Sequence, residues 1–385
     1  MVTNKATRPR RIGIDGSLAC SLRPTGVEHF ARALLHELLR LEAPDLQWYL
    51  YLPPSGNPGT TPPASVVTRY RPDVNTLIKT PWLVGQSWRD RLDVIYAFGH
   101  LLPRACYGRH VLTVHDTAFD DYPETYPPGD AVRAHASVEQ TCRQAERIVT
   151  PSRATQEKLV ATYGFPSERT DVLLEGSRSI FCPGDPGSLP AAVRAGIKPP
   201  FLLSVGRIDR RKNVARVIDA YRMLVTRGVT CGGLLIVGPE DSGSAEVRAR
   251  LKAGAVPGEQ IAFTGYVGED ELVALYRAAA ILVYPSFAEG FGLPVLEAMA
   301  CGTPVVTSNV SSLPEVAGDA ALTVDPSDTE AITGALCRLL TDERLHRTLS
   351  EAGIRRAAEF SWAKSASRLA DSFRRACNVP VAVQG

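Results

Sequence analysis

Short apolar segments alternate with amphipathic segments along this chain, and this alternation constrains the fold more than any other feature. Residues 12–15 are a short apolar run, and after a loop at residues 16–25 the side chains of Leu34, Leu35 and Leu38 recur at helical spacing. Strands that alternate with helices imply a parallel sheet. We expect further strands at residues 48–52, 94–97, 111–114 and 148–150, and helices over 130–146 and after Pro151.

The alternation starts again in the second half of the chain. Residues 201–205 are a continuous apolar run that leads through Gly206 into a helical segment ending near Met223. Further strands are expected at residues 233–237, 261–264, 281–284 and 304–307, with a helix over 269–279. The predicted fold class is therefore α/β, with two Rossmann-like doubly wound units and a largely helical tail after residue 328.

The length of the chain also favours two domains, because a single hydrophobic core rarely grows beyond about 250–300 residues and this chain has 385. Proline and glycine gather at residues 183–190, so this stretch is the predicted linker. We assign residues 1–182 to an N-terminal domain, residues 183–360 to a C-terminal domain and residues 361–385 to a C-terminal helix.

Composition argues against several classes of protein. The net charge is only +2, and no basic stripe with interleaved aromatic residues occurs, so nucleic acid is not an expected partner. The eight cysteines are scattered singly without a C-x-x-C pair, which argues against a disulfide framework and a structural zinc. No apolar run is long enough to span a bilayer and no signal peptide is evident, so we expect a cytoplasmic chain.

The segment at residues 289–306 reads EGFGLPVLEAMACGTPVV and places two carboxylates around a glycine-rich turn and the start of a helix, with Pro294 suited to the first helical position. Seven residues lie between Glu289 and Glu297. Unsatisfied N–H groups suit an anion and carboxylates accept hydrogen bonds from hydroxyls, so this layout fits a phosphorylated sugar. The alternative is that Glu297 only complements the helix dipole and Glu289 is a solvated loop residue. Three residues of the turn can present backbone N–H groups: Phe291, Gly292 and Leu293.

The segment at residues 206–213 reads GRIDRRKN and lies where a predicted strand gives way to a helix. Open α/β sheets bind ligands at such places. Guanidinium and ammonium groups grip phosphate oxygens, so Arg207 and Lys212 are candidates for neutralising a pyrophosphate leaving group. A solvated basic loop is the alternative, and the sequence leaves both open.

His115 follows the strand predicted at residues 111–114, so it also points into a crevice at the carboxyl end of a sheet. A histidine there can hydrogen-bond a substrate hydroxyl or phosphate, although a lone histidine is more often structural. Gly16 and Gly26 flank the first loop, where a phosphate close to the backbone would require small residues. The sequence contains no G-x-G-x-x-G fingerprint, no Asp-x-Asp triplet and no Walker loop, which disfavours nicotinamide or flavin chemistry and metal-held diphosphates.

Several motifs together resemble the family 4 retaining glycosyltransferases. In the second half they are GRIDRRKN at 206–213, FTGYV at 263–267, EGFGLPVLEAMACGTPVV at 289–306 and FSW at 360–362. The first half agrees less densely, through TGVEHFARALL at 25–35, VLTVHD at 111–116 and IVTPSRATQEKL at 148–159. The resemblance implies the GT-B fold, in which an acceptor-binding domain and a nucleotide-sugar-binding domain, both Rossmann-like, face each other across a cleft. The C-terminal helix would cross back to the first domain at Ser361-Trp362.

The resemblance also implies a role for each matching residue. Glu289 would lie beside the donor sugar, Glu297 would bind the ribose hydroxyls, and His115 would lie near the reaction centre. The diphosphate would be held by Arg207 and Lys212. The other donor-binding groups would be the backbone N–H groups of Phe291, Gly292 and Leu293, Gly26 beside the phosphates, and Tyr266 and Val267 along the nucleobase. Family members generally need no metal, so we expect no metal or other cofactor. The candidate catalytic residues are Glu289, His115, Arg207 and Lys212.

The family retains the anomeric configuration of the donor sugar. The resemblance favours front-face displacement, in which the departing phosphate takes the acceptor proton, over a glycosidase-like attack by a carboxylate. The chain departs from the family at one turn. Members often carry Gly-Val-Asp before a Phe-x-Pro step, whereas this chain has Gly176-Ser177-Arg178 before Phe181-Cys182-Pro183.

Two stretches, HDTAFDDYPETY at 115–126 and SSLPEVAGDAALTVDP at 311–326, resemble bacterial mannosyltransferases that build polysaccharides. We therefore expect transfer of a hexose from GDP-mannose, with a UDP-sugar or a dTDP-sugar as alternatives, to a saccharide or a lipid-linked acceptor. A GT-B epimerase or phosphorylase and a non-catalytic nucleotide-sugar-binding subunit are the rival functions. Domain closure is also expected, because the donor groups lie mainly in the second half and His115 in the first.

Apolar and basic side chains are mixed at one further place. They form either a patch that touches the inner face of a membrane or an ordinary amphipathic element that packs on the protein. The residues concerned are Trp82, Leu83, Val84 and Trp88, near Lys79, Arg89 and Arg91.

Overall fold

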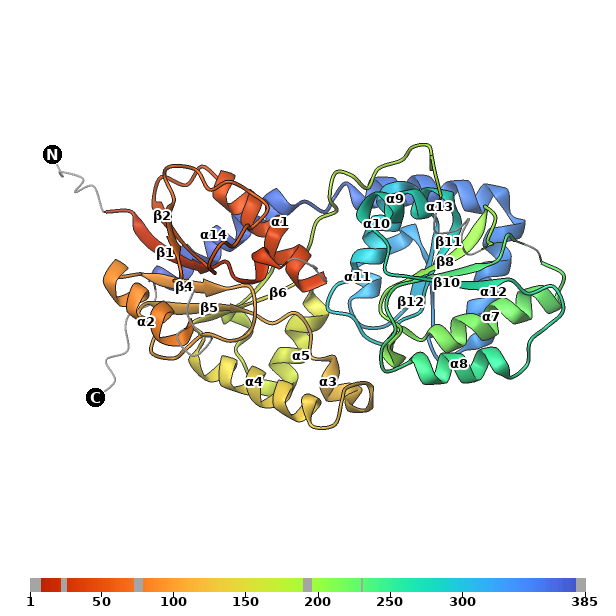
Figure 1. The fold of residues 1–385 in the computed structure, drawn as a ribbon, viewed down its shortest axis with the longest axis horizontal. Coiled ribbons are helices and arrows are strands. Elements are labelled where there is room, and N and C mark those ends of the chain that lie inside the picture. Colours follow the sequence, from red (N-terminus) through yellow and green to blue (C-terminus); the bar gives the residue numbers. More distant parts are fainter. Residues whose placement is uncertain (1–7, 22–25, 73–78, 190–195, 230, 379–385) are drawn as a thin grey trace. The chain divides into compact units, whose positions relative to one another are not determined.

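The computed structural model describes residues 8–21, 26–72, 79–189, 196–229 and 231–378, so residues 22–25 of the predicted first loop lie outside it. The described chain forms two compact units (Figure 1). The first unit contains the chain up to Thr117, Ala134–Glu175 and the chain from Ser361 onward, and the second contains Ala118–Arg133 and Gly176–Phe360. The short segment Ala118–Arg133, which the sequence assigns to the first domain, therefore packs with the second unit.

The first unit is built on a seven-stranded parallel sheet with the strand order β3-β2-β1-β4-β5-β6-β7. In the middle of the sheet, Ile12 of β1 pairs with Trp48 of β2 on one side and with Val94 of β4 on the other. Ile12 and Ile14 are fully buried, as expected for a strand covered on both faces. The strands are β1 (Arg10–Asp15), β2 (Leu46–Leu52), β3 (Val67–Tyr70), β4 (Val94–Ala97), β5 (Arg109–Thr113), β6 (Arg147–Thr150) and β7 (Thr170–Val172).

Helices pack on both sides of this sheet. Helix α1 buries one apolar face that includes Phe30, Leu34 and Leu38, which matches the spacing read from the sequence. Helix α5 begins at a serine cap, where Ser152 Oγ accepts the N–H of Thr155 at 3.1 Å. The longer helices are α1 (Gly26–Arg40), α2 (Lys79–Asp90), α4 (Asp130–Gln144), α5 (Arg153–Tyr163) and α14 (Trp362–Asn378).

The C-terminal helix α14 packs on the first unit, against α1 and strands β4 to β7. The Trp362 ring meets the Phe30 ring edge-on at 5.6 Å, and Phe373 is fully buried beside Trp48 and Tyr96. Helix α14, which follows the second unit in the sequence, thus completes the core of the first unit, as the predicted fold requires.

The second unit is built on a six-stranded parallel sheet with the order β10-β9-β8-β11-β12-β13. The strands are β8 (Phe201–Val205), β9 (Leu234–Val237), β10 (Ile261–Gly265), β11 (Ala279–Tyr284), β12 (Val305–Ser308) and β13 (Leu322–Val324). The helices are α7 (Val214–Thr226), α8 (Ser244–Lys252), α9 (Glu269–Ala278), α10 (Leu293–Cys301), α11 (Leu313–Ala317), α12 (Thr329–Thr341) and α13 (Glu343–Ala357), and α3 (Ala118–Asp121) joins them from the first half of the chain. Two Rossmann-like parallel sheets confirm the predicted fold class.

The loops at the carboxyl edge of the second sheet approach one another at their backbones. A Cβ atom on Gly238, after β9, would lie 2.0 Å from the carbonyl oxygen of Gly206, after β8. Only glycine fits at such a contact, and the φ of +136° at Gly238 also favours it. The GRIDRRKN segment therefore begins on a rigid backbone contact.

The mixed apolar and basic stretch forms helix α2, and it is partly packed on the first unit. Leu83 is buried, whereas Trp88 is 58% exposed. The Trp88 indole N–H nevertheless donates to the Ala105 carbonyl oxygen at 2.9 Å, and its ring lies 4.7 Å from the Tyr107 ring. The side chain of Lys79 lies outside the described part of the structure. Among the helices that the structure describes, none is long and apolar enough to cross a bilayer.

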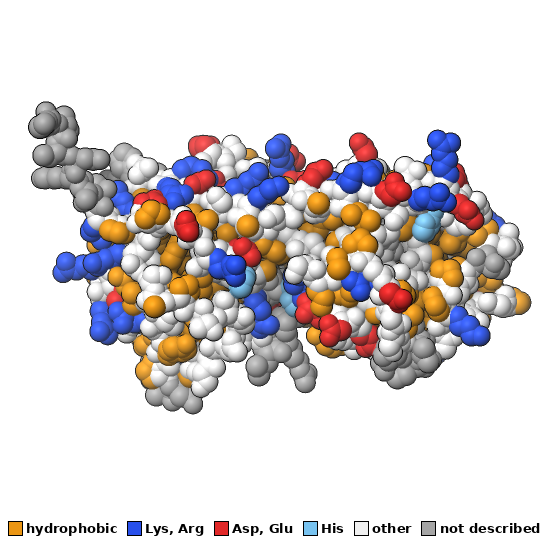
Figure 2. Space-filling model, turned by 90° about the horizontal axis from the view of Figure 1, so that it is seen from above, with side chains coloured by type: hydrophobic (Ala, Val, Ile, Leu, Met, Phe, Trp, Pro, Cys, Tyr) orange, Lys and Arg blue, Asp and Glu red, His pale blue; other side chains and the backbone are white. Residues whose placement is uncertain are grey.

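The surface carries charges of both signs. On the face of the molecule in Figure 2, basic and acidic side chains are interspersed, and apolar side chains lie between them. This distribution agrees with the small net charge of the chain.

Asp171 in the edge strand β7 anchors α14 through a cluster in which Asp171 and Arg147 are buried and Arg375 is about half exposed. Its carboxylate accepts from Arg147 Nε at 2.7 Å, Ser372 Oγ at 2.6 Å and Arg375 Nη2 at 2.7 Å. Burial raises the pKa of Asp171, but the hydrogen bonds from Arg147 and Ser372 outweigh this effect and hold the pKa below its ordinary value. The carboxylate is therefore ionised in the folded protein at neutral pH.

Asp171→Asn is expected to lower the free energy of unfolding by roughly 3 kcal/mol, because it leaves the buried Arg147 guanidinium without its counter-charge. Urea unfolding at neutral pH measures this. The difference from wild type should shrink below about pH 4, since a carboxylate with a depressed pKa loses its stabilising contribution as it is protonated.

Asp45→Asn is the matched control, because Asp45 pairs with Arg374 on the same helix but is about half exposed. It should cost about 0–1 kcal/mol. Equal losses in the two variants would contradict the role assigned to Asp171.

Candidate active site

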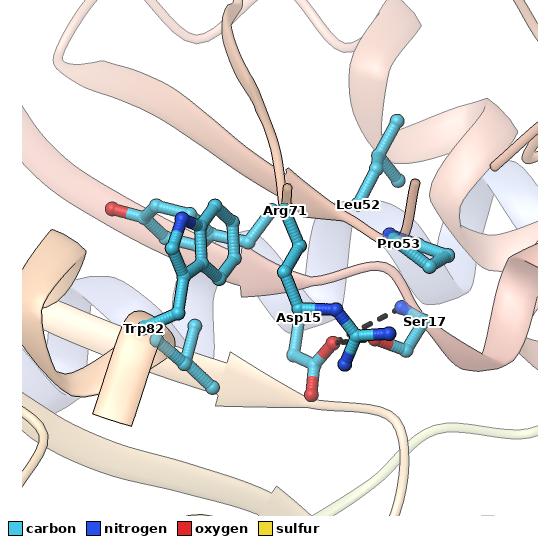
Figure 3. Close-up of a pocket in the computed structure, with 8 residues that line it drawn as sticks. Asp15, Ser17, Leu52, Pro53, Arg71 and Trp82 are labelled. Carbon is cyan, nitrogen blue, oxygen red and sulfur yellow. Dashed lines mark hydrogen bonds between the residues drawn. The ribbon is translucent and has the colours of Figure 1, made fainter. Parts of the chain in front are cut away.

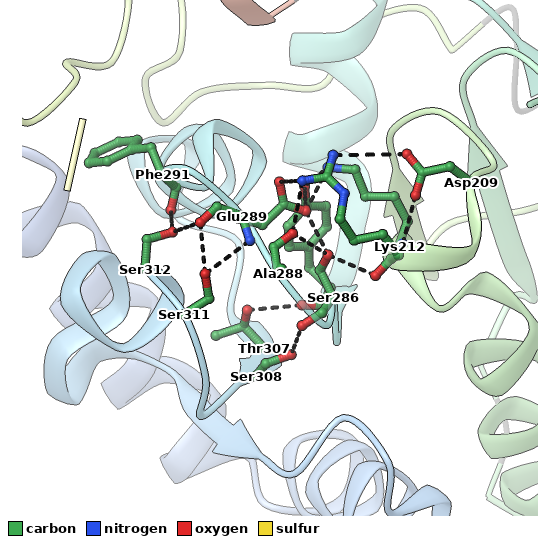
Figure 4. A network of polar contacts seen from close by, with 12 residues as sticks. Asp209, Lys212, Ser286, Ala288, Glu289, Phe291, Thr307, Ser308, Ser311 and Ser312 are labelled. Atoms are coloured by element: carbon green, nitrogen blue, oxygen red, sulfur yellow. Dashed lines mark hydrogen bonds and ion pairs between the residues drawn. The ribbon is translucent and has the colours of Figure 1, made fainter. Parts of the chain in front are cut away.

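The loop between β11 and α10 is shaped by serine hydroxyls and by one glycine (Figure 4). Ser311 Oγ donates to the carbonyl oxygen of Glu289 at 2.8 Å and accepts its N–H at 3.1 Å. Ser312 Oγ lies within hydrogen-bond distance of the carbonyl oxygens of Glu289 (2.9 Å) and Phe291 (2.7 Å). Gly292 has a φ of +118°, which a side chain would disfavour. These contacts fix the direction in which the Glu289 side chain leaves the loop.

The Glu289 carboxylate points into a buried cluster of donors (Figure 4). Its Oε1 atom accepts from Lys212 Nζ at 2.6 Å, Ser286 Oγ at 2.6 Å and the Tyr284 hydroxyl at 2.9 Å. Its Oε2 atom lies 3.7 Å from Arg211 Nη1. Burial raises the pKa of Glu289, but the Lys212 ammonium and the Arg211 guanidinium outweigh it and lower the pKa to about 2. The alternative that Glu289 is a solvated loop residue is therefore wrong.

The four basic side chains of the segment 206–213, which follows β8, lie in different surroundings. Lys212 pairs with Glu289, and its side chain is only 14% exposed. Arg211 donates to the Ala288 carbonyl oxygen at 3.0 Å. Arg207, by contrast, is 58% exposed and pairs with Asp241 at 3.4 Å. The structure brings Lys212 to Glu289 and leaves Arg207 outside this cluster.

Glu297 lies in the second turn of α10 and is buried. Its Oε2 atom accepts from the Tyr276 hydroxyl at 3.1 Å, and its Oε1 atom lies 3.3 Å from Arg178 Nη2. Burial raises the pKa of Glu297, and Arg178 and Tyr276 oppose this only in part. Arg178 also pairs with Glu269. Because Arg178 belongs to the turn that differs from the family pattern expected from the sequence, this turn contacts Glu297 directly.

The remaining candidates of the second unit have unequal exposure. Phe291 is buried and packs edge-on against Phe360 at 5.8 Å. Leu293 is the first residue of α10, and the N-cap residue Gly292 has no side chain to make a capping hydrogen bond. Tyr266 is 71% exposed just after β10, whereas Val267 is only 8% exposed. The start of α10 thus offers backbone N–H groups and the positive end of a helix dipole.

Two candidates lie in the first unit. His115 Nε2 lies 2.6 Å from the carbonyl oxygen of Phe98, and the imidazole meets the Phe30 ring edge-on at 4.8 Å. Burial lowers the pKa of His115, which favours the neutral imidazole. Gly26 is the first residue of α1, and a Cβ atom there would have no heavy atom within 4 Å.

The carboxyl edge of the first sheet also holds a small pocket (Figure 3). Its volume of about 10 Å³ is roughly that needed for one water molecule. Ser17 Oγ donates to the Asp15 carboxylate at 2.6 Å, and Trp82 and Arg71 complete the wall. The Arg71 Nε atom is buried and has no hydrogen-bond partner within the described chain.

Sequence reasoning missed the residues that surround the two glutamates. Arg211 belongs to the basic run, but nothing in the run distinguishes it from Arg207. The other missed groups carry no local signal that links them to a carboxylate: Tyr284 and Ser286 at Glu289, Tyr276 and Arg178 at Glu297, and the loop serines Ser311 and Ser312. No group of three or more His, Cys, Asp and Glu side chains in the described ranges is arranged to hold a metal ion.

Comparison with known proteins covers nearly the whole chain. Residues 24–176 match the family described as Glycosyltransferase Family 4, and residues 190–356 match Glycosyl transferases group 1. The O-antigen chain mannosyltransferase B of Escherichia coli is 33% identical over 294 residues, which cover 75% of this chain and 77% of that protein.

Solved structures share the fold at lower sequence identity. Sucrose-phosphate synthase from Thermosynechococcus elongatus has a TM-score of 0.72 at 21% identity, covering 95% of this chain and 98% of that one. Anabaena Alr3699/HepE in complex with UDP-glucose has a TM-score of 0.71 at 16% identity, covering 95% and 99%. Taken with the two family matches, these findings show that the chain is a glycosyltransferase of family 4 with the GT-B fold.

Proposed function

We propose that this glycosyltransferase moves a hexosyl group from a nucleotide sugar to a saccharide acceptor, free or lipid-linked, in polysaccharide biosynthesis. The observation that carries the proposal is the buried, ionised Glu289, paired with Lys212 beside the uncapped start of α10. GDP-mannose is the first donor, because the Escherichia coli relative at 33% identity is a mannosyltransferase. A UDP-sugar is the alternative, suggested by the Anabaena complex at 16% identity.

Glu289 has one carboxylate oxygen to offer a donor sugar. Oε1 already accepts three hydrogen bonds, whereas the contact that Oε2 makes is the longer one to Arg211 at 3.7 Å. An ionised carboxylate oxygen with spare acceptor capacity can accept a hydrogen bond from a sugar hydroxyl. In this proposal Glu289 orients the hexose and does not attack the anomeric carbon.

Lys212 links the sugar to the leaving group. Its ammonium has three N–H groups, of which one faces Glu289 and one faces the Tyr284 hydroxyl. The third is available for a diphosphate oxygen, and the N–H groups at Gly292 and Leu293 supply neutral donors for the same anion. Arg207 is exposed, and a surface ion pair such as its contact with Asp241 contributes little, so Arg207 can turn to the diphosphate.

The reaction in this proposal retains the anomeric configuration. The bond between the anomeric carbon and the phosphate oxygen breaks, the acceptor oxygen bonds to the same face of that carbon, and the acceptor proton passes to the departing phosphate. Lys212 and Arg207 stabilise the charge that develops on the phosphate. Glu297 binds the ribose, Tyr266 and Val267 line the nucleobase, and His115 and Gly26 act from the first unit; no metal is required.

Lys212→Met is expected to lower kcat for transfer by about 100- to 1,000-fold, because it removes a cation from the developing negative charge. Arg207→Met should also lower turnover, and steady-state kinetics with a functional donor measures both variants. Arg248→Met is the control, since Arg248 is an exposed side chain on α8 that pairs with Glu240. Unchanged turnover in both Lys212→Met and Arg207→Met would contradict the assignment.

Nucleotide preference tests the donor assignment. At equal concentrations GDP should raise the unfolding temperature more than UDP or dTDP, because the ligand that binds the folded state more tightly stabilises it more at a given concentration. Differential scanning fluorimetry measures the shifts. A clear preference for UDP would contradict the mannosyl donor. Binding of a nucleotide sugar without any release of nucleotide, with or without acceptor, would instead support the non-catalytic alternative.

A further inference from the structure

The second unit contains a cavity of about 230 Å³ that the proposed donor chemistry does not use. It lies between the segment Ala118–Arg133, the first turns of α7 and α8, and the loop that follows β11. Pockets for drug-sized ligands have volumes of roughly 300–1,000 Å³, so this cavity suits a smaller ligand. One ring of a saccharide is of that class.

One wall of the cavity is aromatic. The rings of Tyr122 and Phe287 lie 5.8 Å apart at an interplanar angle of 34°, and both side chains are half-buried. The Arg216 guanidinium lies 5.7 Å from the centre of the Phe287 ring. These groups give the cavity an apolar surface next to hydrogen-bond donors, which suits the C–H faces and hydroxyls of a sugar.

The polar groups of the cavity are held in fixed positions. Asn213 donates through Nδ2 to the carbonyl oxygens of Pro285 at 3.0 Å and Pro326 at 2.7 Å. Its Oδ1 atom accepts from Arg216 Nη1 at 3.0 Å. The buried Asp209 carboxylate accepts the Lys212 backbone N–H at 3.0 Å. A ligand therefore meets ordered polar side chains and loses little free energy in arranging them.

The charges that line the cavity nearly balance. Carboxylates come from Glu124, Asp209 and Glu246, and guanidinium groups from Arg210 and Arg216. Arg210 Nε lies 3.9 Å from Glu246 Oε2. A surface of mixed sign gives no strong preference for an anion or a cation, whereas carboxylates and guanidinium groups both hydrogen-bond neutral hydroxyls.

The cavity shares its two supporting loops with the Glu289–Lys212 pair. Phe287 precedes Glu289 by two residues, and its N–H donates to the Arg211 carbonyl oxygen at 2.9 Å. Asp209 caps the turn that carries Lys212. A ligand in the cavity thus contacts the same backbone segments that position the proposed reaction groups.

We propose that this cavity binds one sugar ring of the saccharide acceptor, at a distance from the acceptor hydroxyl that reacts. That the bound sugar belongs to the acceptor rests on the proposed function. The binding of a sugar ring to the cavity, by contrast, can be tested without turnover. In this proposal the segment Ala118–Arg133 contributes part of the sugar site, because it brings Tyr122 and Thr125 from the first half of the chain to the cavity wall.

Saccharide binding to the full chain tests the proposal with two matched variants. Thr125→Trp fills the cavity, whereas Val132→Trp places the same ring on the same segment at a position that is 73% exposed and outside the cavity. The probes are methyl α-D-mannopyranoside, methyl α-D-glucopyranoside and methyl α-D-galactopyranoside, followed by saturation-transfer-difference NMR. At least one glycoside should give a signal with wild type and Val132→Trp that is lost with Thr125→Trp.

Kinetics then separates this inference from the proposed function. With a working donor, Thr125→Trp should raise KM for the saccharide acceptor by about tenfold or more, because it removes the contacts that the cavity makes with one sugar ring. Its affinity for GDP and its rate of donor hydrolysis should equal those of Val132→Trp. Glycoside signals and acceptor KM that are the same in both variants would overturn the cavity proposal and leave the proposed function intact. Absence of donor turnover in wild type would overturn the proposed function, while the NMR result would still decide whether the cavity binds a sugar.

Discussion

The ion pair between Glu289 and Lys212 joins the loops that follow two adjacent strands, β8 and β11. The candidate active site of the second unit depends on this pair. β8 and β11 are neighbours in the parallel sheet, so their carboxyl ends lie side by side. One loop brings the cation and the other brings the carboxylate, and each charge compensates the other where both side chains are largely buried. A buried charge without a partner would cost several kcal/mol, so the pair fixes the conformation of both loops.

The two glutamates of the segment 289–306 have opposite electrostatic environments. Two cations outweigh burial at Glu289 and lower its pKa, whereas burial prevails at Glu297 and raises its pKa. Pairs of titratable groups whose environments separate their pKa values are common at functional sites. Arg178 pairs with Glu297 at 3.3 Å and comes from the turn Gly176-Ser177-Arg178, so a residue 119 positions earlier in the chain supplies the cation beside the second carboxylate.

Much of the fold could be predicted from local sequence patterns, because alternating strands and helices specify parallel sheets. The two glutamates and the glycine turn could also be found, since their signals lie within one short segment. The partners could not be found, because the contact of Glu289 with Lys212 depends on strand order and that of Glu297 with Arg178 joins residues 119 positions apart. Whether Arg211 or Arg207 lies beside Glu289 depends on the conformation of one turn, in which Asp209 caps the backbone and Asn213 has a φ of +59°. The packing of the segment Ala118–Arg133 with the second unit has no sequence signal either.

The pKa of Glu289 tests the central claim most directly. It can be measured by NMR of the protein with ¹³C-labelled glutamate carboxyl groups, with the resonance assigned by Glu289→Gln. The Glu289 resonance should keep its ionised chemical shift from pH 7 down to about pH 4, near the ordinary pKa of a glutamate, because Lys212 and Arg211 lower its pKa to about 2. A midpoint near or above about 4.3, the ordinary value for glutamate, would show that no such ion pair holds the two loops together.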